Sequence, residues 1–384
     1  MKLEIIATST FGLEAVVKRE IQALGYKIVQ SEDGKITFLG DERAVVRANL
    51  WLRTADRIQI KLGEFKALEF EELFQQVKAL PWEEWIPIDG KFIVNGSSVK
   101  SKLSSVPACQ SVSEKAIVER LKDFYSVEHF EKTGALYDIK ITILKDRVTV
   151  TLDTTGPGLH KRGYRQLGVE APIKETLAAA MIQLSFWNKD RLLADPCCGS
   201  GTIPIEAALI GKNIAPGLTR SFVSEGWEAI HSNLWKEERT QAYRAVNQEC
   251  DLRIYASDIN PKAIEVARIN AEEAGVDDCI EFRVADVSEL EADTEGGIVV
   301  TNPPYGERIG DQKGIDKIYE TYKTFFKENP TWSLFVITPD KTIERKAFGR
   351  TADRRRKLYN GRMEVCYYQF HGEKPNDYKN RQGK

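Results

Sequence analysis

The chain has 384 residues, a formal net charge of −2 at pH 7 and a hydrophobic content of 42%. This length favours two or more domains, and the balanced charge excludes a bulk positive field, so nucleic-acid binding would need local basic patches. No apolar run is long enough to span a membrane, the first residues lack a signal peptide's apolar core, and the six cysteines form no CxxC pair. We therefore expect a cytoplasmic protein without a membrane segment, disulfide framework or bound metal.

Residues 1–65 alternate between strand and helix patterns. The Glu32-Asp33-Gly34 turn signals a hairpin between two short strands. The predicted strands cover 3–7, 27–30, 35–38 and 57–62, and the predicted helices cover 13–24 and 41–52. This β-α-β-β-α-β order predicts a ferredoxin-like domain.

Residues 66–155 are predicted to form a second α/β module. Its helices are expected at 70–80 and 113–124, the second starting near Ser113, and its strands at 91–95, 136–144 and 146–152. Lys100 and Lys102 stand among small polar residues beside the first of these strands, which suits contacts with phosphates. A solvated face of a strand and loop explains the same composition equally well.

Residues 156–190 are predicted to be a linker and a leading helix. The linker signal Gly156-Pro157-Gly158 precedes a basic stretch that contains Arg162, Tyr164 and Arg165. Basic residues with an interleaved aromatic ring can hold a polynucleotide backbone and stack on a base. The alternative is a basic linker that packs on neighbouring carboxylates. A helical pattern then covers 173–187, directly after Pro172.

Residues 191–371 repeat a strand followed by a helix, which predicts a doubly wound parallel sheet. The predicted strands cover 191–194, 253–257, 280–284, 297–301 and 332–338, and a terminal hairpin pairs 356–359 with 363–370. The insertion at 211–250 carries no clear pattern, and 372–384 is a polar tail.

The first strand of this sheet leads into a glycine-rich turn. Asp195 ends the strand, Gly199 and Gly201 let the backbone approach a ligand closely, and Thr202 opens a helix. A dinucleotide fingerprint would require glycine where Pro204 stands. An aspartate at this point suits a cationic or hydroxyl-bearing ligand, such as the amino acid part of S-adenosylmethionine.

Two further acids follow the next strands. Asp258 is placed to bind both hydroxyls of a ribose, and Asp286 is placed to accept from the amino group of an adenine. For any one of these aspartates taken alone, a helix cap is the better explanation. Three acids at successive strand ends make coincidence a poor explanation.

The fourth strand ends in Asn302-Pro303-Pro304-Tyr305. The prolines stop the strand and hold the backbone extended, which fixes the Asn302 side chain and the Pro303 carbonyl as two acceptors beside an aromatic ring. Two acceptors take the two hydrogens of a planar NH2 group, so the nitrogen lone pair turns toward an electrophile. The alternative is a strand end that happens to contain two prolines.

The segments DPCCGSGT, SDINP, VADV and TNPPYG resemble the strand-end motifs of class I methyltransferases that act on amino groups. Together with GLHKRGYR, KETLAAAM, NPPYGERIG and RRKLYNGRMEV they resemble bacterial THUMP-domain RNA methyltransferases that make N2-methylguanosine, including the large-subunit ribosomal RNA enzymes. The resemblance covers most of the chain and is strongest over 160–370. It implies a ferredoxin-like domain (1–65), a THUMP module (66–155) and a Rossmann-like methyltransferase domain (191–371).

The resemblance also implies roles for individual residues. Asp195, Gly199 and Gly201 would hold the methionine part of S-adenosylmethionine, and Cys197 and Cys198 would use their side chains for packing. The full cofactor set comprises Asp195, Cys197, Gly199, Gly201, Thr202, Asp258, Ile259, Asp286, Val287 and Asn302. The catalytic set comprises Asn302, Pro303, Pro304 and Tyr305.

The implied reaction is methyl transfer to the N2 amino group of a guanosine in 23S ribosomal RNA, on free RNA or on a ribosomal assembly intermediate. Transfer RNA, adenine N6 in RNA or DNA, and the side-chain amide of a protein glutamine remain alternatives, because the motif fits any planar amino group. A different class of alternative is an RNA-binding assembly factor with a vestigial site. The basic run 354–357 is a further candidate for RNA contact, for which a solvated hairpin edge is the simpler explanation.

Overall fold

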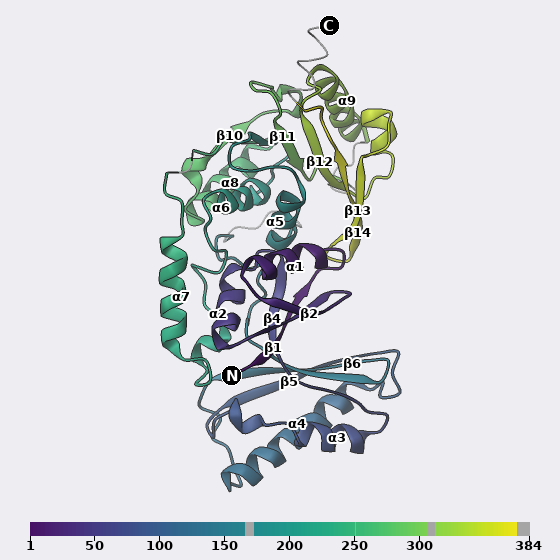
Figure 1. Cartoon of the computed structure of the whole chain (residues 1–384). Coiled ribbons are helices and arrows are strands. Elements are labelled where there is room, and N and C mark those ends of the chain that lie inside the picture. The colour runs from purple at the N-terminus through teal and green to yellow at the C-terminus, as the bar shows by residue number, and fades with distance from the viewer. Residues whose placement is uncertain (166–172, 250, 306–311, 375–384) are drawn as a thin grey trace. The chain divides into compact units, whose positions relative to one another are not determined.

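The structure is a computed structural model that describes residues 1–165, 173–249, 251–305 and 312–374 (Figure 1). The chain forms two compact units, and each unit is assembled from three separate segments. Unit 1 comprises Met1–Ser9, Val17–Leu159 and Gly217–Ala242, and unit 2 comprises Thr10–Val16, His160–Pro216 and Tyr243–Lys384.

Unit 1 is built on a seven-stranded sheet with the order β2-β3-β1-β4-β7-β6-β5. Its elements are β1 (Leu3–Ser9), α1 (Glu14–Ala23), β2 (Lys27–Glu32), β3 (Lys35–Gly40), α2 (Glu42–Trp51), β4 (Ala55–Lys66), α3 (Phe70–Lys78), β5 (Lys91–Val99), α4 (Val106–Tyr125), β6 (Leu136–Leu144), β7 (Arg147–Asp153) and α7 (Ser232–Arg244).

Strand β4 joins the two predicted N-terminal modules into this one sheet. It is 12 residues long, and its first half pairs antiparallel with β1 while its second half pairs antiparallel with β7. Ile58 and Ile60 are buried on one face of the strand. The predicted strand ended at residue 62, because the alternating pattern fades before the pairing with β7 does.

Helix α4 begins earlier than predicted. It starts at Val106 with a proline in its first turn, and Ser113 lies inside it, fully buried. The prediction that Ser113 lies near the start of this helix was therefore wrong. Proline is favoured in a first turn because its missing N–H is not needed there, so Pro107 was the better signal.

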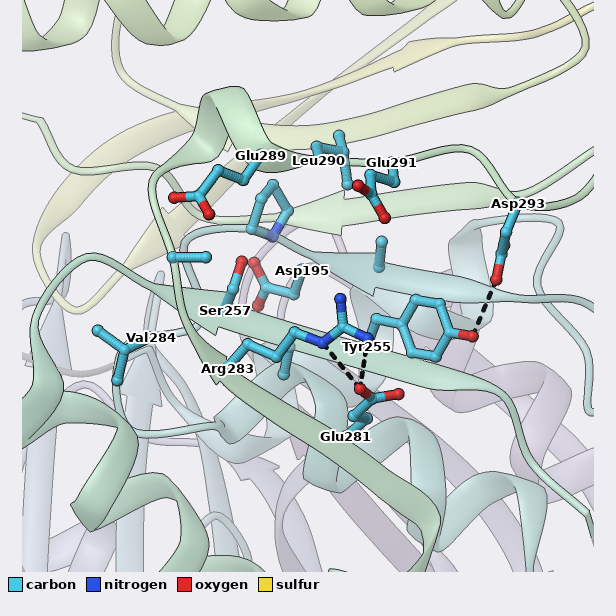
Figure 2. A pocket seen from close by; sticks show the side chains of 14 residues that line it. Asp195, Tyr255, Ser257, Glu281, Arg283, Val284, Glu289, Leu290, Glu291 and Asp293 are labelled. Atoms are coloured by element: carbon cyan, nitrogen blue, oxygen red, sulfur yellow. Dashed lines mark hydrogen bonds and ion pairs between the residues drawn. The ribbon is translucent and has the colours of Figure 1, made fainter.

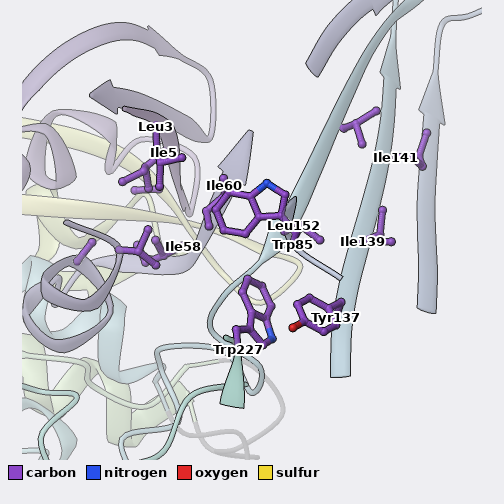
Figure 3. Close-up of a cluster of buried hydrophobic side chains, with 14 of the residues drawn as sticks. Leu3, Ile5, Ile58, Ile60, Trp85, Tyr137, Ile139, Ile141, Leu152 and Trp227 are labelled. Carbon is purple, nitrogen blue, oxygen red and sulfur yellow. The ribbon is translucent and has the colours of Figure 1, made fainter. Parts of the chain in front are cut away.

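The segment Gly217–Ala242, whose structure the sequence did not predict, completes the core of unit 1. The Trp227 ring stacks on Tyr137 with 4.8 Å between centroids, and its Nε1 donates to the Leu136 carbonyl at 2.9 Å. Figure 3 shows this pair beside Trp85 among the aliphatic side chains of the sheet. Phe222 and Trp235 form a second stacked pair at 5.1 Å.

Unit 2 contains a second seven-stranded sheet, with the order β10-β9-β8-β11-β12-β14-β13. Its elements are α5 (Glu175–Leu184), β8 (Leu193–Asp195), α6 (Thr202–Gly211), β9 (Ile254–Asp258), α8 (Pro261–Glu273), β10 (Ile280–Val284), β11 (Ile298–Thr301), α9 (Gln312–Glu328), β12 (Ser333–Thr338), β13 (Arg354–Asn360) and β14 (Met363–Phe370).

Helices cover both faces of this sheet. In β11, Ile298 and Val300 belong to the core shared with α5, α6 and α8, whereas Val299 belongs to the core shared with α9. Five strands run parallel, and β14 and β13 add an antiparallel hairpin. The predicted doubly wound sheet with a terminal hairpin is confirmed.

The described helices include none that is both long and apolar enough to cross a membrane. Within the same ranges, no three His, Cys, Asp or Glu side chains are grouped in a way that could hold a metal ion.

Candidate active site

The candidate site is formed where β8, β9, β10 and β11 end at the same edge of the unit 2 sheet. The strand order reverses between β8 and β11, since β9 and β10 follow on one side and β12 on the other. Open α/β sheets bind ligands at the carboxyl ends of their strands beside such a reversal.

The glycine-rich loop after β8 depends on two left-handed residues. Gly199 has φ +54° and Gly201 has φ +79°, a conformation that side chains with a Cβ rarely adopt. A Cβ at Gly201 would lie 3.0 Å from the Ala267 side chain on α8, whereas a Cβ at Gly199 would meet no described atom within 4 Å. Gly201 therefore allows close packing, and Gly199 leaves space beside the loop.

Asp258 fastens this loop to the end of β9. Its Oδ2 accepts from the Gly199 N–H at 3.0 Å, and its Oδ1 accepts from the Asn260 N–H at 2.9 Å. The Cys198 N–H also donates to the Ser257 carbonyl at 2.9 Å. The loop is consequently held in one conformation by bonds from the neighbouring strand.

Asp195 is buried beneath the loop, with an exposed fraction of 1%. Its Oδ1 accepts from the Thr301 hydroxyl at 2.8 Å and from the Cys197 N–H at 3.2 Å, while its Oδ2 has no hydrogen-bond partner within the described ranges. Burial raises the pKa of Asp195 to about 7, and the charge of Asp258 adds to this shift. An additional donor at Oδ2 would lower that pKa again.

A cavity of about 310 Å³ adjoins Asp195 on one face of the sheet (Figure 2). Its lining residues are Ala194, Asp195, Pro196, Tyr255, Ala256, Ser257, Glu281, Arg283, Val284, Ala285, Glu289, Leu290, Glu291 and Asp293. Five carboxylates against one guanidinium make its wall acidic. Ile259 is 69% exposed and Val284 is 54% exposed, so two apolar side chains face outward at the ends of β9 and β10.

Asn302 and Tyr305 lie at the end of β11. The Asn302 Oδ1 is buried and has no hydrogen-bond partner in the described part of the chain. Tyr305 is 8% exposed, and its hydroxyl accepts from the Asn360 Nδ2 at 3.2 Å. Pro303 is buried and Pro304 partly buried. Residues 306–310 of the NPPYGERIG motif lie outside the described residues.

Asp286 has bonding partners of its own. It caps a short helical turn by accepting from the Ser288 N–H at 3.0 Å and hydroxyl at 2.6 Å, and it pairs with the Lys317 ammonium at 2.8 Å. The Lys317 bond and these two bonds lower the pKa of Asp286 to about 2. The carboxylate therefore stays ionised and has the geometry of a cap, with Val287 buried directly after it.

The adjacent cysteines are not activated thiols. Burial, reinforced by the charge of Asp195, raises the pKa of both Cys197 and Cys198. A thiol that stays protonated is a weak nucleophile. Both side chains belong to the hydrophobic clusters of unit 2, as expected of packing residues.

The predicted RNA contacts fall into two groups. Lys100 and Lys102 are on the surface of unit 1, with Lys102 3.8 Å from Glu69. Arg162 and Tyr164 are instead 3% and 4% exposed inside unit 2, where both contact the buried Glu206 at 3.3 and 3.2 Å.

Arg165 is also committed to protein contacts. Its Nη2 donates to the Thr202 hydroxyl at 2.6 Å and to the Ile173 carbonyl at 3.0 Å, and its Nη1 lies 3.4 Å from Glu175. The structure thus favours the alternative of a basic segment packed on neighbouring carboxylates. In the run 354–357, Arg355 pairs with Glu344, Arg356 donates to the Gly12 carbonyl, and Lys357 pairs with Glu364.

Three residues that shape the site were not predicted. Thr301 holds Asp195, and its hydroxyl in an otherwise apolar strand was the available signal. Glu206 is a lone carboxylate in the apolar helix α6, a pattern that indicates a buried partner. Asn360 precedes Gly361 in the hairpin turn, so its sequence context indicated only a turn.

Comparison with known families gives three matches along the chain. Residues 162–369 match the family described as the RMKL-like methyltransferase domain. Residues 4–59 match the RlmL ferredoxin-like domain, and residues 67–153 match the THUMP domain.

Two curated relatives are similar over most of the chain. The predicted RNA methyltransferase YpsC of Bacillus subtilis strain 168 is 49% identical over 371 residues, which are 96% of each chain. The ribosomal RNA large subunit methyltransferase K/L of Psychromonas ingrahamii is 36% identical over 362 residues, 92% of this chain. The match covers 48% of that second relative, so this chain spans about half of its length.

Two solved structures share the complete fold. A protein of Listeria monocytogenes, described as a predicted N6-adenine-specific DNA methylase, has a TM-score of 0.93 and 47% identity, covering 97% of both chains. The second structure is SMU.472, a predicted methyltransferase that was solved in complex with SAH. It has a TM-score of 0.92 and 42% identity, and the match covers 97% of this chain and 99% of SMU.472.

The burial of Arg162 predicts a stability effect. Arg162→Ala leaves Glu206 buried without its guanidinium partner, which typically costs about 3–5 kcal/mol. We expect the variant to lower the free energy of unfolding of unit 2 by this order, measured by chemical denaturation. Lys161→Ala, which changes the exposed neighbour, is the matched control. A fully stable Arg162→Ala variant with weakened RNA binding would restore the RNA-contact interpretation.

The raised pKa of Asp195 predicts a pH effect on stability. The ordinary value of 3.8 applies to the unfolded chain, so between pH 4 and 7 the native state holds a proton that the unfolded state has lost. Stability therefore falls as pH rises toward 7 and then levels off. Asp195→Asn cannot ionise, so its stability relative to wild type should increase by about 2–3 kcal/mol from pH 5 to pH 8. Denaturation curves at several pH values measure this, with exposed Asp190→Asn as the control; a constant difference across pH would contradict it.

Proposed function

Because this chain belongs to the family of RMKL-like methyltransferases, we propose that it methylates the exocyclic N2 amino group of a guanosine in RNA, with S-adenosylmethionine as methyl donor. The proposed substrate is large-subunit ribosomal RNA in the cytoplasm, either as free RNA or within an assembly intermediate. The 36% identity to the Psychromonas ribosomal RNA enzyme supports that choice, and the THUMP match supports RNA over other polymers.

One observation carries the proposal: a buried amide oxygen without a hydrogen-bond partner in the described chain belongs to a residue three positions before a buried aromatic ring. The Asn302 Oδ1 has no partner in the described chain, and Tyr305 follows it after two prolines. Leaving a buried polar atom unsatisfied costs on the order of 1–3 kcal/mol. A substrate NH2 group would remove this cost, so the site is matched to a planar amine.

The residues at the strand ends fit the proposed cofactor. The open space at Gly199 accommodates a ligand against the loop backbone, and the unpartnered Asp195 Oδ2 can accept from an ammonium group. We assign Asp258 to the ribose, and the exposed Ile259 together with Val287 to the faces of the adenine. Asp286 retains one lone pair, on Oδ2, for the adenine amino group while it caps its turn.

The proposed catalysis relies on positioning. When bound, S-adenosylmethionine supplies the methyl group, so that its C–S bond breaks while the N–C bond forms, and the substrate nitrogen then loses one proton. Asn302 Oδ1 and the Pro303 carbonyl would accept the two amino hydrogens, which turns the lone pair out of conjugation. Tyr305 would stack on the base and offset part of the unstacking cost of roughly a few kcal/mol. No strong base is required, because the proton leaves after the attack.

We propose that unit 1 binds the RNA. Lys100 and Lys102 remain candidates because both are on the surface beside the end of β5. RNA of defined structure is generally bound by its shape and phosphates, and two surface lysines suit that mode. Arg162, Tyr164 and Arg165 are not carried forward as contacts, because their polar groups bond within unit 2.

Adenine N6 is the second candidate target. The Listeria structure is described as a predicted N6-adenine-specific DNA methylase, and the proposed roles of Asn302 and Tyr305 would suit either amino group. A vestigial site in an assembly factor is a poorer explanation, because the acids Asp195 and Asp258 and the residue Asn302 are all present at the strand ends.

The first experiment incubates the protein with radiolabelled S-adenosylmethionine and total RNA from a strain that lacks the gene, followed by nucleoside chromatography. We expect label in N2-methylguanosine of large-subunit ribosomal RNA. Asn302→Ala should lower the rate by about 100-fold or more, as loss of one group that acts in the transition state does elsewhere. Calorimetry with S-adenosylmethionine separates the catalytic part of this loss from any loss of cofactor binding.

The other outcomes separate the alternatives. Label in N6-methyladenosine keeps the site chemistry and replaces the base, and label in transfer RNA replaces the substrate. Cofactor binding without transfer to RNA, isolated ribosomal subunits or their precursors would reject the RNA proposal. A function that is lost in cells without the gene, but that the Asn302→Ala variant still provides in full, would support the assembly-factor alternative.

A further inference from the structure

We infer that Asn360 is a positioning residue for the Tyr305 ring, and that the segment Thr10–Val16 holds the hairpin that carries Asn360. This inference rests on the proposed function of Tyr305. It adds a residue distant in sequence from every strand-end motif, and it gives a role to the N-terminal segment that unit 2 contains.

The hydrogen bond to Tyr305 comes from a hairpin tip. Asn360 ends β13, and its Nδ2 donates to the Tyr305 hydroxyl at 3.2 Å. A tyrosine ring rotates about two side-chain bonds. A fixed contact at the hydroxyl restricts rotation about the Cα–Cβ bond, which would move the whole ring, whereas the hydroxyl oxygen lies on the axis of the Cβ–Cγ bond. Tyr305 follows two prolines that fix the backbone, so the Asn360 bond restricts a side-chain rotation that the prolines leave free and keeps the ring in place.

The hairpin itself is anchored on its inner face. Asn360 pairs with Met363 across the turn, and Leu358 pairs with Val365. Leu358 and Val365 are buried in the same cluster as Tyr367, whose hydroxyl donates to the Met181 carbonyl at 2.7 Å. The strands below the tip are therefore fixed to the core of unit 2.

The segment Thr10–Val16 braces the outer strand β13, which lies at the edge of the sheet. Arg356 Nη1 donates to the Gly12 carbonyl at 2.9 Å, and the Phe11 ring meets Tyr359 edge-on at 6.2 Å. A Cβ at Gly12 would lie 2.6 Å from the Lys357 carbonyl oxygen, so only glycine permits this approach. Leu13 is fully buried in the same core as Leu358.

These contacts form one continuous path. The segment Thr10–Val16 holds β13, β13 presents Asn360, and Asn360 holds the ring proposed to stack on the target base. Covering an edge strand with a loop is common and protects against aggregation. Protection alone requires neither the side-chain bond to Tyr305 nor a glycine at the contact, so the positioning role explains more of the observed contacts.

The test compares Asn360→Ala with Tyr305→Phe, which removes the accepting hydroxyl, and with the double variant. Loss of the bond should lower kcat on ribosomal RNA from the deletion strain about 3- to 10-fold, the range of one neutral hydrogen bond. The two single variants should match, and the double variant should be no slower than either, because both remove the same interaction. The dissociation constant for S-adenosylmethionine should stay unchanged, and the thermal unfolding midpoint should fall by no more than a few degrees, the effect of one hydrogen bond.

Two further variants complete the series. Asn360→Asp should retain most of the rate, because its carboxylate can accept from the Tyr305 hydroxyl in place of donating. Arg362→Ala, on an exposed residue of the same turn, is the matched control and should behave as wild type. Multiplicative losses in the double variant, or a loss of stability that accounts for the rate, would overturn the inference.

A second readout does not depend on the reaction. In protein labelled with 3-fluorotyrosine, the Tyr305 signal is identified by its absence in Tyr305→Phe. Asn360→Ala and Arg356→Ala should shift or broaden that signal, whereas Arg362→Ala should leave it in place. An unmoved Tyr305 signal would overturn the inference even if methylation occurs. If the two variants shift the signal but the wild-type protein methylates no RNA, the proposed function alone is rejected.

Discussion

The candidate site depends on one constraint, the parallel alignment of β8, β9 and β11 that brings their carboxyl ends to one edge. The pairing sets Asp195 beside the last residues of β11, and the Thr301 hydroxyl then reaches it at 2.8 Å. From the other side, Asp258 on β9 binds the backbone of the loop that follows β8. A shift of one residue in either pairing would turn these side chains to the opposite face. The two helical layers that fix this register are therefore as necessary to the site as its polar residues.

The polar residues at this edge are of two kinds, which the structure separates clearly. Asp258 and Asp286 have their carboxylates bonded to backbone N–H groups, so they shape the loops. Asp195 Oδ2 and Asn302 Oδ1 are buried acceptors without a partner in the described chain. Shaping groups lower the free energy of the folded protein alone, while unsatisfied acceptors raise it until a donor arrives. The pair of unsatisfied acceptors therefore supports the proposal that ligands supply hydrogens at these two atoms.

Local patterns predicted the parts of the fold that depend on local chemistry. The strand at Ile280–Val284 was predicted to the residue, because its apolar and charged residues alternate between flanking acids and leave few alternatives. The glycine loop and the end of β11 were predicted because glycine and proline act through their own backbones. Arg162 could not be assigned in this way, since its partner Glu206 is 44 residues away and only the folded unit shows that both are buried. For the same reason, Trp227 gave no sign that it packs on Tyr137.

Each unit depends on a segment that lies within the other unit's region of the sequence. Unit 2 takes Thr10–Val16 from within the N-terminal region, and unit 1 takes Gly217–Ala242 from within the methyltransferase region. A cut at residue 159 would deprive unit 2 of Leu13 and Val16, two fully buried side chains, and would deprive unit 1 of the stacked Trp227. Losing large side chains from a packed core costs several kcal/mol each, against a typical total stability of roughly 5–15 kcal/mol. The sequence boundary between the two regions is therefore not a folding boundary, and the edge strand that carries Asn360 requires residues from the start of the chain.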